Sequence, residues 1–61
     1  MSIYTKKELL NFINNNKEIK QTIVEIRFFD GFTTLQDREY KRLLELVCND
    51  YNLYSQIVEL I

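Results

Sequence analysis

The stretch TLQDREYKRLLELVCNDYNLYSQIVELI, Thr34–Ile61, decides the fold expected for this chain. Drawn at 100° per residue, its apolar side chains gather on one side of a helix, and seven-residue steps such as Tyr40–Val47–Tyr54–Ile61 recur along it. This periodicity indicates an amphipathic helix whose apolar face is wider than a two-position seam. Such a face can pack on its own chain and still leave area for a partner.

One place in this stretch, Asn49-Asp50, has two interpretations. Asp50 falls inside the apolar arc, where a charge is costly unless it is paired or hydrated. Either the helix is continuous and Asp50 reaches water or a partner's cation, or the helix breaks and Asp50 caps a last short helix. The seven-residue register persists across the site, which favours a continuous helix. At its start, Thr33 or Thr34 is the expected cap, and Thr33 with Gln36 has the spacing of a capping box.

A first helix is expected over Tyr4–Asn16. Thr5 and Glu8 have the spacing of a capping box, which marks the start of this helix. The asparagine run 14–16 ends it, because asparagine favours turns and tolerates left-handed backbone. The side chains expected on its buried face, with the last at the margin, are Leu9, Leu10, Ile13 and Phe12.

The segment 21–35 between these helices is interpreted as a β-hairpin. It is rich in β-branched and aromatic residues, and residues 24–28 alternate apolar and polar as a half-buried strand does. Asp30-Gly31 is a two-residue hairpin signal, and it would place Phe29 opposite Phe32.

The rival interpretation of this segment is a second helix over Lys17–Asp30. Ile19, Ile23 and Ile26 would share one helical face, and Gly31 would lie just past the C-terminus. The strand accounts better for Val24 and Phe28, so the hairpin is preferred. The expected fold is therefore a single-domain α+β miniprotein over 1–61: N-terminal helix, β-hairpin and long amphipathic C-terminal helix. An all-α bundle of three or four helices is the alternative.

Composition excludes several classes of function. The chain has no histidine and a single cysteine, Cys48, so an internal disulfide is impossible and the usual zinc sites are not expected. Acid–base and covalent catalysis lack their usual residues, and one glycine cannot form a phosphate-binding loop. We expect no enzyme, no cofactor and no metal. No apolar run approaches the roughly 20 residues of a membrane span, and no secretory signal pattern is present, so a cytoplasmic protein is expected.

Nucleic-acid binding is the main rival to protein binding. The net charge is −1, and the cluster Arg38, Lys41 and Arg42 is interleaved with acidic residues. The segment 43–61 has a spacing like that of a helix-turn-helix, but no Lys or Arg follows Arg42 in the helix that would enter the groove. A small DNA-binding regulator is therefore the second hypothesis, and a structural assembly subunit is the third.

The preferred function is a small protein-binding module that inhibits or regulates another protein. A 61-residue chain has a marginal core, and surplus apolar helix face favours a homodimer or a heterologous protein target. Frequent Ile, Asn, Lys, Tyr and Phe, with no Ala or Pro, is a bias common in phage and mobile-element genes, so the hypothesis names a bacterial host enzyme or defence system as the target. The residues expected at the interface are Tyr51, Leu53, Tyr54, Ile57, Val58, Leu60, Ile61, Phe29 and Phe32.

Overall fold

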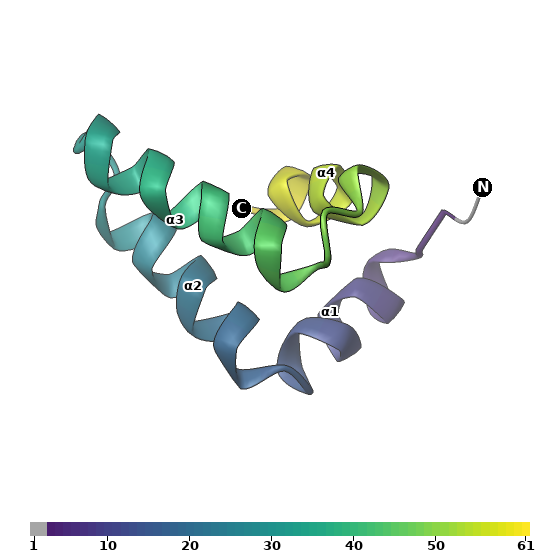
Figure 1. The fold of residues 1–61 in the computed structure, drawn as a ribbon. Helices are drawn as coiled ribbons and strands as arrows, with labels where there is room; N and C mark the ends of the chain where they lie inside the picture. The colour runs from purple at the N-terminus through teal and green to yellow at the C-terminus, as the bar shows by residue number, and fades with distance from the viewer. Residues whose placement is uncertain (1–2) are drawn as a thin grey trace.

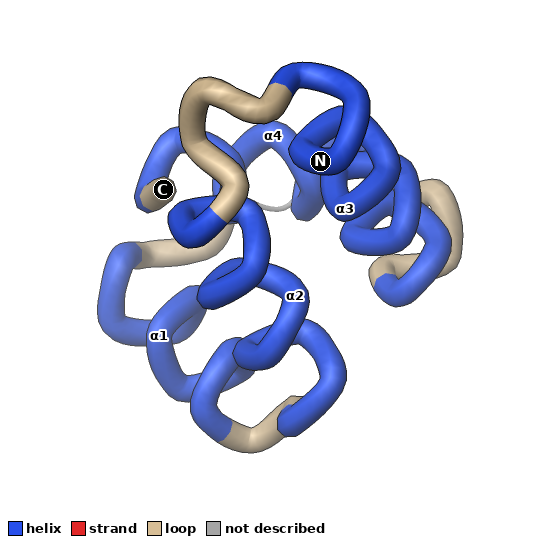
Figure 2. Tube along the Cα trace, turned by 90° about the vertical axis from the view of Figure 1, so that its left-hand side faces the viewer, coloured by secondary structure: helices blue, strands red, loops and turns tan. Residues whose placement is uncertain are grey.

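Four helices follow one another in the computed structural model, which describes residues 3–61. They are α1 (Lys6–Asn14), α2 (Lys17–Phe28), α3 (Thr33–Leu46) and α4 (Tyr51–Leu60). α2 and α3 run side by side as an antiparallel pair, and α1 and α4 pack across one end of it (Figure 1). Residues 3–61 contain no strand (Figure 2). The fold is all-α, so the predicted α+β fold is wrong and the alternative, a helical bundle, is the one observed. Met1 and Ser2 of the predicted domain lie outside the described residues.

The predicted hairpin is replaced by α2 and the turn after it. Ile19, Ile23 and Ile26 are buried on one face of α2, as the rival interpretation requires. Val24 and Phe28, the residues that favoured a strand, point outward and are 51% and 76% exposed. The alternation at 24–28 was therefore local, whereas the i, i+4, i+7 stripe of isoleucines extends over residues 19–26 and gives α2 a complete buried face.

The predicted long C-terminal helix is also wrong, because it breaks between Leu46 and Tyr51. Cys48 and Asn49 adopt left-handed backbone, with φ of 57° and 59°. The Asn49 N–H donates to the Leu44 carbonyl at 2.9 Å and the Cys48 N–H donates to the Glu45 carbonyl at 3.0 Å. These two bonds form a Schellman motif, which ends a helix and is usually marked by glycine in the position that Cys48 occupies.

Asp50 then begins α4. Its carboxylate accepts the backbone N–H of Leu53 at 3.1 Å, so a residue inside the apolar arc is used as a cap. The Schellman motif at the end of α3 and the Asp50 cap at the start of α4 supply hydrogen-bond partners for the backbone groups there, so the chain can turn between the two helices. The second interpretation of Asn49-Asp50, a broken helix capped by Asp50, is confirmed.

The two predicted capping boxes have opposite outcomes. At α1, the Glu8 N–H donates to Thr5 Oγ1 at 3.2 Å and the Thr5 N–H donates to Glu8 Oε1 at 3.0 Å, which confirms the box. These bonds to the carboxylate hold the pKa of Glu8 below its usual value. At α3, Phe32 is the N-cap residue and no side chain caps the helix. Gln36 instead donates from Nε2 to the Ile26 carbonyl at 3.2 Å, which ties the first turn of α3 to the last turn of α2.

The core lies where all four helices meet. Thr22 is the one buried polar residue described, and its hydroxyl donates to the Glu18 carbonyl at 2.8 Å. The N-terminal segment is joined to α4 by the Tyr4 N–H, which donates to Gln56 Oε1 at 2.9 Å. The molecule measures 32 × 19 × 17 Å. The buried apolar side chains are Leu9, Ile13, Ile19, Ile23, Ile26, Leu43, Val47 and Ile57.

Candidate interaction surfaces

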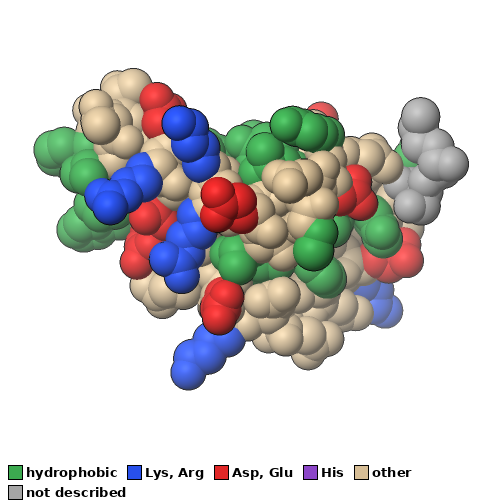
Figure 3. All heavy atoms as spheres, viewed as in Figure 1, with side chains coloured by type: hydrophobic (Ala, Val, Ile, Leu, Met, Phe, Trp, Pro, Cys, Tyr) green, Lys and Arg blue, Asp and Glu red, His purple; other side chains and the backbone are tan. Residues whose placement is uncertain are grey.

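The turn that joins α2 to α3 carries an exposed aromatic cluster, which we call the tip surface: Phe28, Phe29, Phe32 and Leu35. Phe28 and Phe32 are 76% and 62% exposed, and Leu35 is also exposed. The Phe28 and Phe29 rings meet edge to face, with centroids 5.3 Å apart. Apolar side chains gather at this end of the molecule, at the left in Figure 3. Large aromatics clustered in solvent are typical of protein-binding sites.

The backbone of the turn holds these side chains in place. The Phe29 N–H donates to the Glu25 carbonyl at 2.9 Å, and the Phe32 N–H donates to the Phe29 carbonyl at 2.8 Å. Gly31 adopts φ of 91°, which a side chain would strain although a Cβ there would meet no atom within 4 Å. The Gln36 side chain adds a hydrogen bond from α3 to α2 next to the tip surface.

The α4 residues predicted at the interface lie mostly inside. Ile57 is fully buried in the core. Five others are half-buried against it: Leu53, Tyr54, Val58, Leu60 and Ile61. Burial raises the pKa of the Tyr54 hydroxyl, with smaller contributions from Tyr40, Asp37 and Tyr51.

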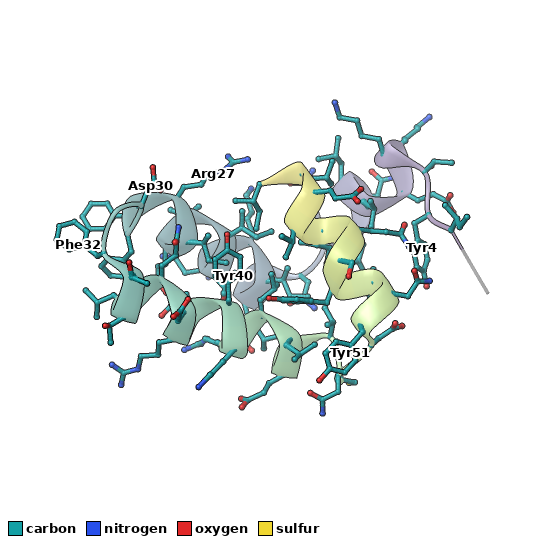
Figure 4. The ribbon with its side chains drawn as sticks, turned by 90° about the horizontal axis from the view of Figure 1, so that it is seen from above. Tyr4, Arg27, Asp30, Phe32, Tyr40 and Tyr51 are labelled. Carbon is teal, nitrogen blue, oxygen red and sulfur yellow. The ribbon has the colours of Figure 1, made fainter. Side chains whose placement is uncertain are left out.

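Tyr51 and Phe32 are the two most exposed residues of the predicted interface, at 67% and 62%. They lie at opposite ends of the molecule (Figure 4), so one small contact cannot include both. Phe29, also predicted, is half-buried beside Phe28. Sequence reasoning missed Phe28 and Leu35. A helical projection of α2 would have found Phe28, because it lies opposite the isoleucine stripe.

Titratable and metal-ligating side chains are scattered over the described part of the chain. Residues 3–61 contain no group of three or more His, Cys, Asp or Glu side chains that could hold a metal ion. Cys48 is exposed and unpaired as a thiol. Glu39 on α3 has a buried Oε2 atom that accepts no hydrogen bond, and burial, followed by the neighbouring Glu25 carboxyl, raises its pKa.

The comparison with a helix-turn-helix extends to the break between α3 and α4 but no further. α4 contains no Lys or Arg, and exposed Asn52, Ser55 and Glu59 occupy its outer side. The clustered cations Arg38, Lys41 and Arg42 all belong to α3. Phosphate attraction is therefore weak on the helix that should read the groove.

Comparisons with known proteins matched no family model, no curated protein and no solved structure. Within residues 3–61, the helices are too short or too polar to cross a membrane.

Proposed function

We propose that this chain is a non-enzymatic protein-binding module that inhibits or regulates another protein, and that the tip surface makes the contact. Two exposed phenylalanines support this proposal. Phe28 and Phe32 take no part in the buried core, which is formed by other side chains from all four helices. The fold therefore does not need aromatic rings at these positions, whereas a binding site gains from large, rigid apolar side chains.

The setting proposed for this contact is the cytoplasm of a bacterial host, with a host enzyme or defence protein as the target. The composition bias toward Ile, Asn, Lys, Tyr and Phe supports the phage or mobile-element origin. The alternative is a homodimer that forms through the tip surface. In the absence of a target it would have twice the mass of a monomer.

The test compares the wild-type protein with the double variant Phe28→Ser/Phe32→Ser in affinity capture from a bacterial lysate. Tyr51→Ser is the matched control, because it removes an equally exposed aromatic from the opposite end of the molecule. We expect the wild type and the control to retain a protein that the double variant loses by at least about tenfold. Since both phenylalanines are exposed, the double variant should melt within a few degrees of the wild type.

Two results would contradict the proposal. The first is an identical set of captured proteins for the wild type and the double variant. The second is tight, salt-sensitive binding to duplex DNA in a gel shift, which would move the chain to the DNA-binding class. Light scattering behind a sizing column, run on the same samples, separates a homodimer from a monomer that awaits a different protein.

A further inference from the structure

A groove separate from the tip surface lies where α1, α2 and α4 meet. It encloses about 200 Å³. Its floor is formed by the buried side chains Ile13, Ile23 and Ile57. Leu10 and Val24 stand at its edge and are 44% and 51% exposed, although both are apolar. We call this site the α2–α4 groove; Leu60 of α4 and Ile61, which follows this helix, also line it.

The volume of the groove limits what it can hold. A dry protein cavity of about 150 Å³ accepts a benzene molecule, and sites for drug-sized ligands begin near 300 Å³. A site of about 200 Å³ with apolar walls therefore suits one bulky apolar side chain, such as Phe or Leu, presented by a partner.

The charged side chains that line the groove have one sign. Lys20 and Arg27 line it, and no acidic side chain does. Both cations are exposed, and neither has an ion-pair partner among residues 3–61. Figure 4 shows Arg27 projecting from α2 on the side where α4 ends. An apolar floor with two unpaired cations at its rim is complementary to an apolar side chain flanked by carboxylates.

The acidic residues of α2 lie on its other edge. Glu25 neighbours Glu39 of α3, and Glu18, seven residues earlier, shares the Glu25 side of the helix. The two edges of α2 therefore differ in sign, positive toward α1 and α4 and negative toward α3. This separation keeps the two carboxylates of α2 away from the groove.

The spacing along α2 defines the partner further. Lys20 and Arg27 are seven residues apart, about 10 Å along the helix, with Val24 between them on the same side. A partner helix lying along α2 would match them with carboxylates at positions i and i+7 and would place an apolar side chain at i+3 or i+4 over the groove. This is the helix-in-groove mode of recognition.

We infer that the α2–α4 groove binds an acidic amphipathic helix of a partner protein, whose bulky apolar side chain enters the groove while its carboxylates pair with Lys20 and Arg27. The inference rests on the proposed protein-binding function and adds to it a second surface and the chemistry of the partner. The tip surface contributes no side chain to this groove.

The test uses a fluorescein-labelled synthetic peptide of about 16 residues, rich in Ala and Gln, with Glu at i and i+7 and Phe at i+3. A second peptide differs only in having Lys at the two Glu positions. Fluorescence anisotropy is measured against the full chain. We expect the acidic peptide to bind at least about tenfold more tightly than the basic one, and its affinity to fall as salt rises.

Matched variants locate the binding. Lys20→Glu/Arg27→Glu should weaken binding of the acidic peptide at least about tenfold and strengthen binding of the basic peptide. Lys41→Glu/Arg42→Glu changes the net charge by the same amount on α3, and it should alter either affinity by less than about twofold. Equal losses in the two variants would mean nonspecific attraction and would overturn the inference, as would equal binding of the two peptides. If duplex DNA displaced the labelled acidic peptide at a lower concentration than the unlabelled peptide does, Lys20 and Arg27 would be phosphate-binding residues and the inference would be wrong.

Failure here is distinguishable from failure of the tip proposal. The double variant Phe28→Ser/Phe32→Ser should bind the acidic peptide as the wild type does. If no peptide binds although lysate capture still depends on the phenylalanines, the groove inference is wrong and the tip proposal stands. If the double variant captures the same proteins as the wild type while peptide binding depends on Lys20 and Arg27, the tip proposal is wrong and the groove inference is retained.

Discussion

Shortening Ile57 tests whether α4 belongs to the core of the single chain. Its side chain is fully buried, so Ile57→Ala removes three carbon atoms from the interior. At about 0.8 kcal/mol for each, the transfer cost is about 2.5 kcal/mol. The cavity left behind brings the expected loss to about 3–4 kcal/mol, within the range measured for such substitutions.

This loss is large for a chain of this size. A stability of about 0.05–0.15 kcal/mol per residue gives a total of about 3–9 kcal/mol for 61 residues. Ile57→Ala should therefore lower the melting temperature by at least about 12 °C and leave a measurable unfolded fraction. Ile57→Val keeps the chain folded and should cost only about 1 kcal/mol, which makes the pair a graded series.

Urea unfolding followed by circular dichroism measures both variants, with Tyr51→Ala as the control on the same helix. Because Tyr51 is 67% exposed, its removal should change the free energy of unfolding by less than about 0.5 kcal/mol. Each measurement is made at two protein concentrations. If Ile57→Ala matches Tyr51→Ala, or if its effect depends on concentration as it would in an obligate dimer, α4 is not held by its own chain and the packing described here is refuted.

Two further substitutions test local features. Asp50→Ala should lower the free energy of unfolding by about 1 kcal/mol, because the N–H of Leu53 loses its acceptor, whereas Asp50→Asn should retain most of the wild-type stability. Amide hydrogen exchange at Leu53 checks the cause. Equal protection of this N–H in the two variants would show that the Asp50 side chain does not cap α4. Glu39→Gln should be more stable than the wild type at neutral pH, because it removes a partly desolvated carboxyl group that lies beside Glu25. Since the folded-state pKa of Glu39 is raised above the ordinary value of 4.5, the stabilisation from its neutral form is complete below 4.5 and is lost as the pH rises through the folded-state pKa. The difference in the free energy of unfolding between Glu39→Gln and the wild type should therefore shrink as the pH falls from neutral toward 4.5. A constant difference across that range would contradict the raised pKa of Glu39.

The N-terminal half shows which patterns are reliable in a short sequence. The capping box of α1 joins Thr5 to Glu8, three residues later, so the sequence was sufficient to predict it. The strand prediction failed because Val24 and Phe28 were assumed to need burial. A surface helix can expose both, and the isoleucines of the same segment already supplied a complete buried face.

The end of α3 could not be predicted in the same way. Helix stops are usually found from glycine or proline, and neither is present between Thr33 and Ile61. The stop instead uses Cys48 and Asn49 in left-handed backbone, a conformation that asparagine tolerates but that costs most other L-residues, cysteine included, about 1–2 kcal/mol. The Schellman hydrogen bonds and the Asp50 cap offset part of this cost, and the packing of α4 against the core, which involves residues far apart in the chain, adds to them.

This one break also changes where binding should be sought. A continuous helix over 34–61 would be about 40 Å long and would carry Tyr54, Val58 and Ile61 beyond the rest of the molecule. Broken at 47–50, the chain folds the second half back, so that its apolar face completes the core. Two of the exposed apolar side chains then belong to α2, Phe28 at the tip and Val24 at the groove, and both lie on the side of α2 away from its buried isoleucines. The core needs one face of α2, whereas Val24 and Phe28 on the other face are largely exposed, so substitutions at these two positions, rather than on α4, should separate binding from folding.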